Sequence, residues 1–117
     1  TLEVAQLQTA ILLELARMNH EKDWVQQFHY GALRNVNKRM FDRLGPDTGY
    51  DTIGDWKSAQ AISSFLNALN VDDSLAKTIL YNINPSENYV VATMLGNFQD
   101  GSVPGKIQFG SGWWNAD

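Results

Sequence analysis

Three short segments with strand composition alternate with segments that have helical spacing, and this alternation limits the chain to few folds. Leu7, Ile11 and Leu15 recur every four residues, which is typical of one face of a helix. Residues 24–30 are instead rich in aromatic and β-branched side chains, which favour a strand. These patterns predict helices over 2–18, 34–44, 56–70 and 86–98, and strands over 24–30, 77–83 and 106–110.

The predicted order, α-β-α-α-β-α-β, places the chain in the α/β class. Strands that alternate with helices are typical of a parallel sheet with helical crossovers. The segment from Lys77 to Phe109 has the length of one βαβ unit. Asp55 is the expected N-cap of the third helix, because its side chain can accept hydrogen bonds from the first N–H groups.

Composition excludes several classes of protein. The chain has 117 residues, which suits one domain, and 44% of them are apolar, which is enough for a core. Nine basic against 13 acidic residues give a net charge of -4, so we expect no nucleic-acid partner. The absence of cysteine excludes disulfides and cysteine-based zinc sites. No apolar run is long enough to span a bilayer, so we expect no membrane partner.

Both ends of the sequence interrupt a pattern. The chain starts at Thr1, inside a helical pattern, and stops shortly after the third predicted strand. We therefore expect a piece of a longer protein, and a single partial domain over residues 1–117.

Candidate functional residues follow the predicted strands, where parallel α/β folds collect their sites. His29 can transfer a proton or bind a metal, or it can be an ordinary hydrogen-bonded strand residue. The planar fork of Arg34 suits a carboxylate ligand, although a solvated or helix-pairing arginine is the alternative. Trp113 and Trp114 follow a Gly-Ser-Gly turn and can wall a sugar pocket or pack in the core.

Two aspartates in the loop over residues 44–51 allow two interpretations. Asp47 and Asp51 can bind a cation, but Gly-Pro-Asp-Thr-Gly is also common turn chemistry. The sequence contains no glycine-rich phosphate loop, no His-x-x-x-His zinc pattern and no nucleophile elbow.

Several sequence blocks, in one order along nearly the whole chain, resemble uronate (glucuronate) isomerase. They are QFHYGALRN at 27–35, LGPDTGYD at 44–51, KTILY at 77–81, ATM at 92–94, GNFQ at 96–99 and QFGSGWW at 108–114. The chain departs from the family after Trp114, where Phe-Asn-Asp is expected and Asn115-Ala116-Asp117 stands.

The resemblance implies a fragment of a (β/α)8 TIM barrel of the amidohydrolase superfamily, at about strands five to seven. It implies a cytoplasmic enzyme of hexuronate catabolism that interconverts D-glucuronate and D-fructuronate, and D-galacturonate and D-tagaturonate. His29, the expected catalytic residue, matches a family histidine that points at the metal and substrate region, and Trp113 matches a tryptophan that lines the substrate pocket. Arg34 matches a family arginine, and its planar fork makes it the expected binder of the substrate carboxylate. The parent is expected to use a divalent metal such as zinc, held by His-x-His and Thr-Asp-Ser-Arg motifs that this sequence lacks. We expect this segment to bind no metal.

The sequence is compatible with three functional classes. The chain can be an inactive piece of an isomerase, a binding module for acidic sugars, or a fragment without a function of its own. Three parallel strands without neighbours leave unpaired edges, so we also expect the fragment to self-associate.

Overall fold

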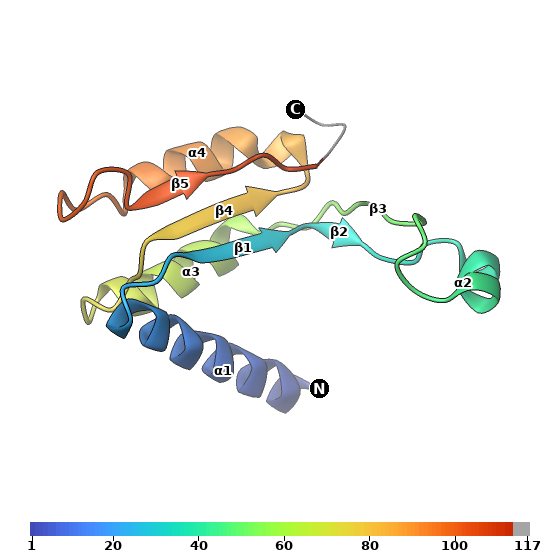
Figure 1. Ribbon diagram of the computed structural model, residues 1–117, viewed down its shortest axis with the longest axis horizontal. Coiled ribbons are helices and arrows are strands. Elements are labelled where there is room, and N and C mark those ends of the chain that lie inside the picture. Colours follow the sequence, from blue (N-terminus) through green and yellow to red (C-terminus); the bar gives the residue numbers. More distant parts are fainter. Residues whose placement is uncertain (114–117) are drawn as a thin grey trace.

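The computed structural model describes residues 1–113 and shows a parallel sheet backed by helices (Figure 1). Its helices are α1 (Leu2–Glu21), α2 (Lys38–Leu44), α3 (Ala59–Asn70) and α4 (Asn88–Gly96), with a short 3-10 helix η1 (Pro85–Glu87). Its strands are β1 (Gln26–Tyr30), β2 (Ala32–Leu33), β3 (Thr52–Ile53), β4 (Thr78–Asn82) and β5 (Ile107–Phe109). The predicted α/β class with three parallel strands is confirmed.

The main sheet has the order β1-β4-β5, and both pairs of neighbours are parallel. The register places His29 beside Tyr81 and Gln26 beside Thr78. Hydrogen bonds from Ile83 to Tyr30 and from Gly110 to Leu80 continue the pairing beyond the strand ends. The carboxyl ends of all three strands therefore lie at one edge of the sheet.

The two faces of the sheet differ in what covers them. Helices α3 and α4 lie behind it in Figure 1, and the core forms between them and the sheet. The buried core residues are Ala16, Leu66, Leu69, Leu75, Leu80, Val91, Leu95, Phe98 and Ile107. On the other face, the Tyr81 hydroxyl donates to Gln27 Oε1 at 2.7 Å, and His29 is exposed. This second face therefore carries polar side chains from both β1 and β4.

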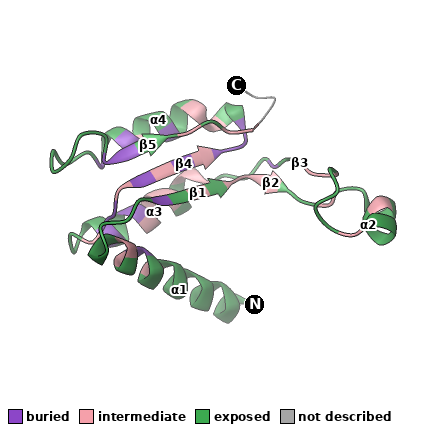
Figure 2. Cartoon of the chain, in the orientation of Figure 1, coloured by how far each residue is buried: buried purple, intermediate pink, exposed green. Residues whose placement is uncertain are grey.

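Helix α1 is confirmed, but its apolar stripe is not covered by the described residues. Among its side chains only Ala16 is buried, where the helix packs near α3. The stripe Leu7, Ile11, Leu15 and Met18 is between 49% and 61% exposed. Figure 2 accordingly shows most of α1 in the colour of exposed residues.

A small antiparallel ladder between β2 and β3 was missed by the sequence analysis. Ala32 pairs with Ile53 and Leu33 with Thr52, and the N–H of Val36 donates to the carbonyl of Tyr50 at 2.9 Å. The ladder closes residues 34–51 into a lobe that contains α2. Figure 1 shows this lobe projecting beyond the carboxyl end of β1.

The prediction that Asp55 caps the third helix is wrong. Helix α3 begins at Ala59, and the capping position is Ser58. Asp55 Oδ1 instead accepts from Asn84 Nδ2 at 3.1 Å, which holds the segment before the helix against the end of β4. The Ser58 hydroxyl donates to the carboxylate of Glu87, so this helix start is fixed by a tertiary contact.

Candidate active site

The structure brings the three candidate site residues to one cavity at the carboxyl edge of the sheet. The cavity has a volume of about 340 Å³. It is lined by His29, Ala32, Arg34, Asp47, Gly49, Asp51, Ile83 and Trp113. These residues come from the end of β1, the lobe over 34–51, the segment after β4 and the turn after β5.

His29 is held by a backbone carbonyl from the other end of the chain. Its Nε2 lies 2.7 Å from the carbonyl oxygen of Gly112. A carbonyl can only accept, so Nε2 carries the proton and Nδ1 of the neutral ring is left as the proton acceptor. The ring of Tyr81 lies beside the imidazole, with 5.7 Å between ring centroids.

The glycines of the Gly-Ser-Gly turn allow the backbone to approach the strands closely. A Cβ at Gly112 would lie 2.5 Å from the carbonyl oxygen of Asn82, and one at Gly110 would lie 2.1 Å from the Tyr81 ring. Because no side chain fits at either position, glycine lets the turn lie over β4. Trp113 then follows at the cavity wall, whereas Trp114 and residues 115–117 lie outside the described residues.

Arg34 is paired with the two loop aspartates. Its Nη1 donates to Asp51 Oδ2 at 2.6 Å and lies 3.9 Å from Asp47 Oδ1. The backbone N–H of Asn35 donates to the other oxygen of Asp51 at 2.9 Å. This N–H, followed by the hydrogen bond from Arg34, keeps the pKa of Asp51 below its usual range. The sequence offered these aspartates as cation ligands or turn residues, and the structure places them on a guanidinium.

Asn82 and Asn84, at the end of β4, form hydrogen bonds with the backbone around the cavity. Asn82 Nδ2 donates to the carbonyl of Asn84 at 2.8 Å and to Asn88 Oδ1 at 3.0 Å. Asn84 Nδ2 bonds Asp55, and its Oδ1 accepts from the N–H of Ser86 at 3.1 Å. These contacts join the end of β4 to η1, to the start of α4 and to the segment before α3. Ile83, the residue directly after β4, lies at the cavity wall.

Within residues 1–113, no three His, Cys, Asp or Glu side chains are grouped so that they could hold a metal ion. Among the helices of this part of the chain, none combines the length and apolar character that a membrane span requires.

Comparison with known families identifies the chain. The model of a family described as glucuronate isomerase matches residues 1–117. The chain belongs to the glucuronate isomerase family. The resemblance seen in the sequence blocks is thereby confirmed.

The uronate isomerases that this family member resembles are much longer than the chain. It is 62% identical over 115 residues to the uronate isomerase of Bacteroides fragilis, covering 98% of this chain and 25% of the relative. The uronate isomerase of Cellvibrio japonicus is 56% identical over 115 residues, with 98% and 24% covered. The chain spans about a quarter of the length of the relatives it matches.

A solved structure supports the same assignment. The crystal structure of uronate isomerase from Thermotoga maritima matches with a TM-score of 0.74 and 31% identity, over 89% of this chain and 21% of that one. That neighbour is a TIM barrel, and the three parallel strands with their helices form part of this fold. Barrel enzymes place their sites at the carboxyl ends of the strands, which is where the cavity of this family member lies.

Proposed function

We propose that this chain is part of an aldose-ketose isomerase that interconverts D-glucuronate and D-fructuronate, and D-galacturonate and D-tagaturonate. The observation that carries the proposal is the convergence of His29, Arg34 and Trp113 on one cavity. Family membership supports the same reaction. In the complete protein, residues 1–117 form one partial domain at about strands five to seven of the barrel, in an enzyme of the cytoplasm.

Such a reaction moves a proton between neighbouring carbons through an enediol-like intermediate. It needs a general base and stabilisation of the oxyanion that develops. We assign His29 the handling of a substrate hydroxyl proton, because its contact with Gly112 leaves Nδ1 as the acceptor. Arg34 binds the hexuronate carboxylate, which its planar fork can take in two parallel hydrogen bonds. Trp113 forms a wall for the sugar.

A divalent metal such as zinc in the complete protein is supported by the family resemblance alone. Residues 1–113 do not fit such a site by themselves, because they group no three metal-binding side chains. No step of the reaction is therefore assigned to a metal here. The chain on its own is expected to be inactive, since catalysis needs its groups held together in one site.

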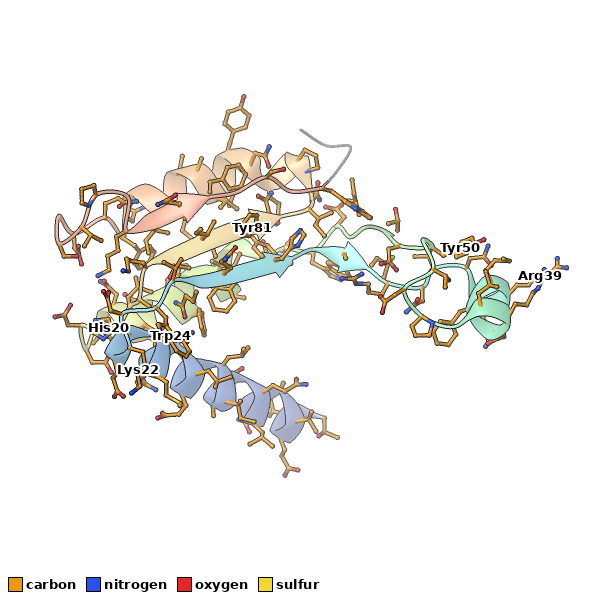
Figure 3. The ribbon with its side chains drawn as sticks, in the orientation of Figure 1. His20, Lys22, Trp24, Arg39, Tyr50 and Tyr81 are labelled. Carbon is orange, nitrogen blue, oxygen red and sulfur yellow. The ribbon has the colours of Figure 1, made fainter. Side chains whose placement is uncertain are left out.

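Turnover by the full-length protein tests the assignment of His29. D-glucuronate is supplied with zinc, and ketose formation is followed. His29→Ala should lower kcat about a hundredfold or more. His20→Asn is the matched control, because Figure 3 shows His20 at the opposite end of the sheet from the carboxyl edge. Unchanged turnover in His29→Ala would overturn the role of His29.

The same protein samples can distinguish an enzyme from a module that only binds acidic sugars. Quenching of tryptophan fluorescence by D-glucuronate without any ketose product would indicate binding without catalysis. If the full-length protein neither forms ketose nor binds D-glucuronate, the segment does not have this function. The acidic net charge argues against a nucleic-acid partner.

We also propose that the isolated 117-residue chain associates with a second copy of itself. The outer strands β1 and β5 each pair on one side only among the described residues, and the α1 stripe is exposed. Light scattering should give a mass above the 13.1 kDa of one chain. Replacing Leu7 and Ile11 by serine should lower that mass, whereas a wild-type monomer would contradict the proposal.

A further inference from the structure

The antiparallel ladder at the base of the lobe sets the position of one acidic side chain. The pairs Ala32–Ile53 and Leu33–Thr52 define its register. If the antiparallel pairing is continued by one residue, past the end of β2 and before the start of β3, Arg34 comes opposite Asp51, although the two are 17 residues apart in sequence. The backbone pairing therefore places the Asp51 carboxylate next to the Arg34 guanidinium. Their contact does not depend on side-chain flexibility alone.

Both oxygens of the Asp51 carboxylate are occupied by different partners. Oδ1 accepts from the backbone N–H of Asn35 at 2.9 Å, and Oδ2 accepts from Arg34 Nη1 at 2.6 Å. Asn35 has a φ of 54°, a left-handed conformation that asparagine tolerates better than most residues. The side chain of Asp51 is 13% exposed. It is thus fixed to the turn on one side and to Arg34 on the other.

Asp47 approaches the same nitrogen without such support. Its Oδ1 lies 3.9 Å from Arg34 Nη1, and its side chain is 85% exposed. A pair at this distance and exposure is weak. The two carboxylates therefore differ: Asp51 is hydrogen-bonded to the turn, whereas Asp47 makes only a long, exposed contact with Arg34.

Because the guanidinium is rigid, a hydrogen bond at one of its nitrogens restricts the orientation of the whole group. The guanidinium is planar and presents its N–H donors in a rigid fork, so a hydrogen bond at Nη1 limits where the remaining donors point. The side chain of Arg34 is 63% exposed and lines the same cavity as His29. A ligand carboxylate in that cavity can therefore meet donors that are already oriented.

We propose that Asp51 is a positioning residue, which holds the Arg34 guanidinium in the orientation that receives the carboxylate of the substrate. This inference rests on the proposed hexuronate reaction. Asp51 acts through Arg34 and does not itself touch the substrate. Preorganisation of this kind lowers the ordering cost of binding, so its loss should appear in substrate affinity.

The decisive variant is Asp51→Asn in the full-length protein. The amide oxygen can still accept from the Asn35 N–H, so the turn is retained, whereas the amide NH2 then faces Arg34 and cannot accept from it. We expect KM for D-glucuronate to rise about tenfold or more, with a smaller change in kcat. In an Arg34→Gln background, the same substitution should add no further increase in KM.

Two other aspartates of the lobe calibrate this result. Asp47→Asn should raise KM less than Asp51→Asn does, because its contact is longer and exposed. Asp42→Asn, which removes a partner of Lys38 on α2, is the matched control outside the cavity. A wild-type KM in Asp51→Asn, while the wild-type protein turns over hexuronate, would overturn the positioning role and leave the proposed function standing.

A second measurement decides the matter without turnover and without the Asp51 variant. The carboxyl pKa of Asp51 can be followed by NMR in the wild-type and Arg34→Gln full-length proteins. Loss of the paired guanidinium should raise this pKa, because Arg34 contributes to keeping it low. An unchanged pKa would overturn the pairing on which the proposal depends, even in a protein that turns over no hexuronate.

Discussion

The Nε2 nitrogen of His29 donates to the carbonyl oxygen of Gly112 across 2.7 Å. This contact joins the first strand of the sheet to the turn after the last one. It also selects the tautomer of the imidazole, since a carbonyl oxygen can accept a hydrogen bond but cannot donate one. The Gly-Ser-Gly turn therefore does more than carry Trp113 to the cavity, because it sets which nitrogen of His29 can act as a base.

Enlarging Gly112 should damage the site through this contact. A methyl group there would lie 2.5 Å from the carbonyl oxygen of Asn82, so Gly112→Ala must shift the turn away from Asn82 and disturb the contact of the Gly112 carbonyl with His29. We expect kcat for hexuronate in the full-length protein to fall about tenfold or more. Gly96→Ala is the control, because nothing lies within 4 Å of its new methyl group. Equal kinetics for the two variants would contradict this account of the turn.

The ion pair between Lys106 and Asp100 should make stability depend on acid pH. Lys106 is buried, and its hydrogen bond, followed by those from Ser102, holds the pKa of Asp100 well below its usual range. The folded pKa lies below the unfolded value of about 4. The pair therefore stabilises the fold above about pH 4, and this contribution is lost as the pH falls toward the folded pKa.

Thermal unfolding of Asp100→Asn from pH 7 to pH 3 measures this dependence. The variant should melt below the wild type at pH 7, and the gap should narrow as the pH falls. Asp23→Asn removes the partner of Lys77, and Asp23 is 89% exposed in that pair. It should change the melting temperature little at any pH. A constant gap for Asp100→Asn would contradict the linkage.

Tyr30 should ionise only at strongly alkaline pH. Burial, and then the negative charge of Glu87, raise its pKa to about 12, with an opposing effect from the Ser58 hydroxyl. The unfolded chain releases this proton near pH 10. Stability should therefore fall as the pH rises from about 10 toward 12, because the folded state keeps the proton longer.

Absorbance titration of tyrosinate in the wild type and in Tyr30→Phe identifies this group. The transition near pH 12 should be absent from Tyr30→Phe and present in Tyr89→Phe, whose tyrosine is 87% exposed in the wild type. Ionisation of Tyr30 near pH 10 in the folded protein would show that its surroundings do not disfavour the anion.

Leu66 should be among the most sensitive positions of the core. Its side chain is fully buried between α3 and the sheet, so Leu66→Ala leaves a cavity as well as losing apolar burial. We expect a loss of about 2–5 kcal/mol in the free energy of unfolding, measured by urea denaturation. Leu44→Ala, at a side chain that is 55% exposed, should cost far less. Similar losses for both would contradict the assigned core.

Sequence patterns predicted the first helix from its apolar periodicity and the first main strand from its aromatic and β-branched composition. The parallel order of β1, β4 and β5 follows from the crossover helices between them. The β2–β3 ladder was not predicted because two residues per strand are too few to show an alternation of apolar and polar side chains. The start of α3 was misplaced because Asp55, a good capping residue by type, is engaged by Asn84 of a distant segment.

The candidate site was only partly accessible from sequence for a similar reason. His29, Arg34 and Trp113 were named because each lies at or just after the end of a predicted strand, and all three line one cavity. The pairing of Arg34 with Asp51 depends on the register of a ladder that the sequence did not reveal. Opposite charge was the only sequence signal for this pair, because a predicted helix over 34–44 separates Arg34 from the loop that ends at Asp51.

The distance along the chain between His29 and Gly112 has a consequence for the protein during its synthesis. The carbonyl that holds the imidazole is added 83 residues after it. At usual translation speeds this takes roughly 4 to 17 seconds, far longer than a strand or helix needs to form. A nascent chain can therefore complete β1 while its histidine still lacks the partner that selects its tautomer. The hydrogen bond that selects the tautomer of His29 can therefore form only after Gly112 has been added to the chain.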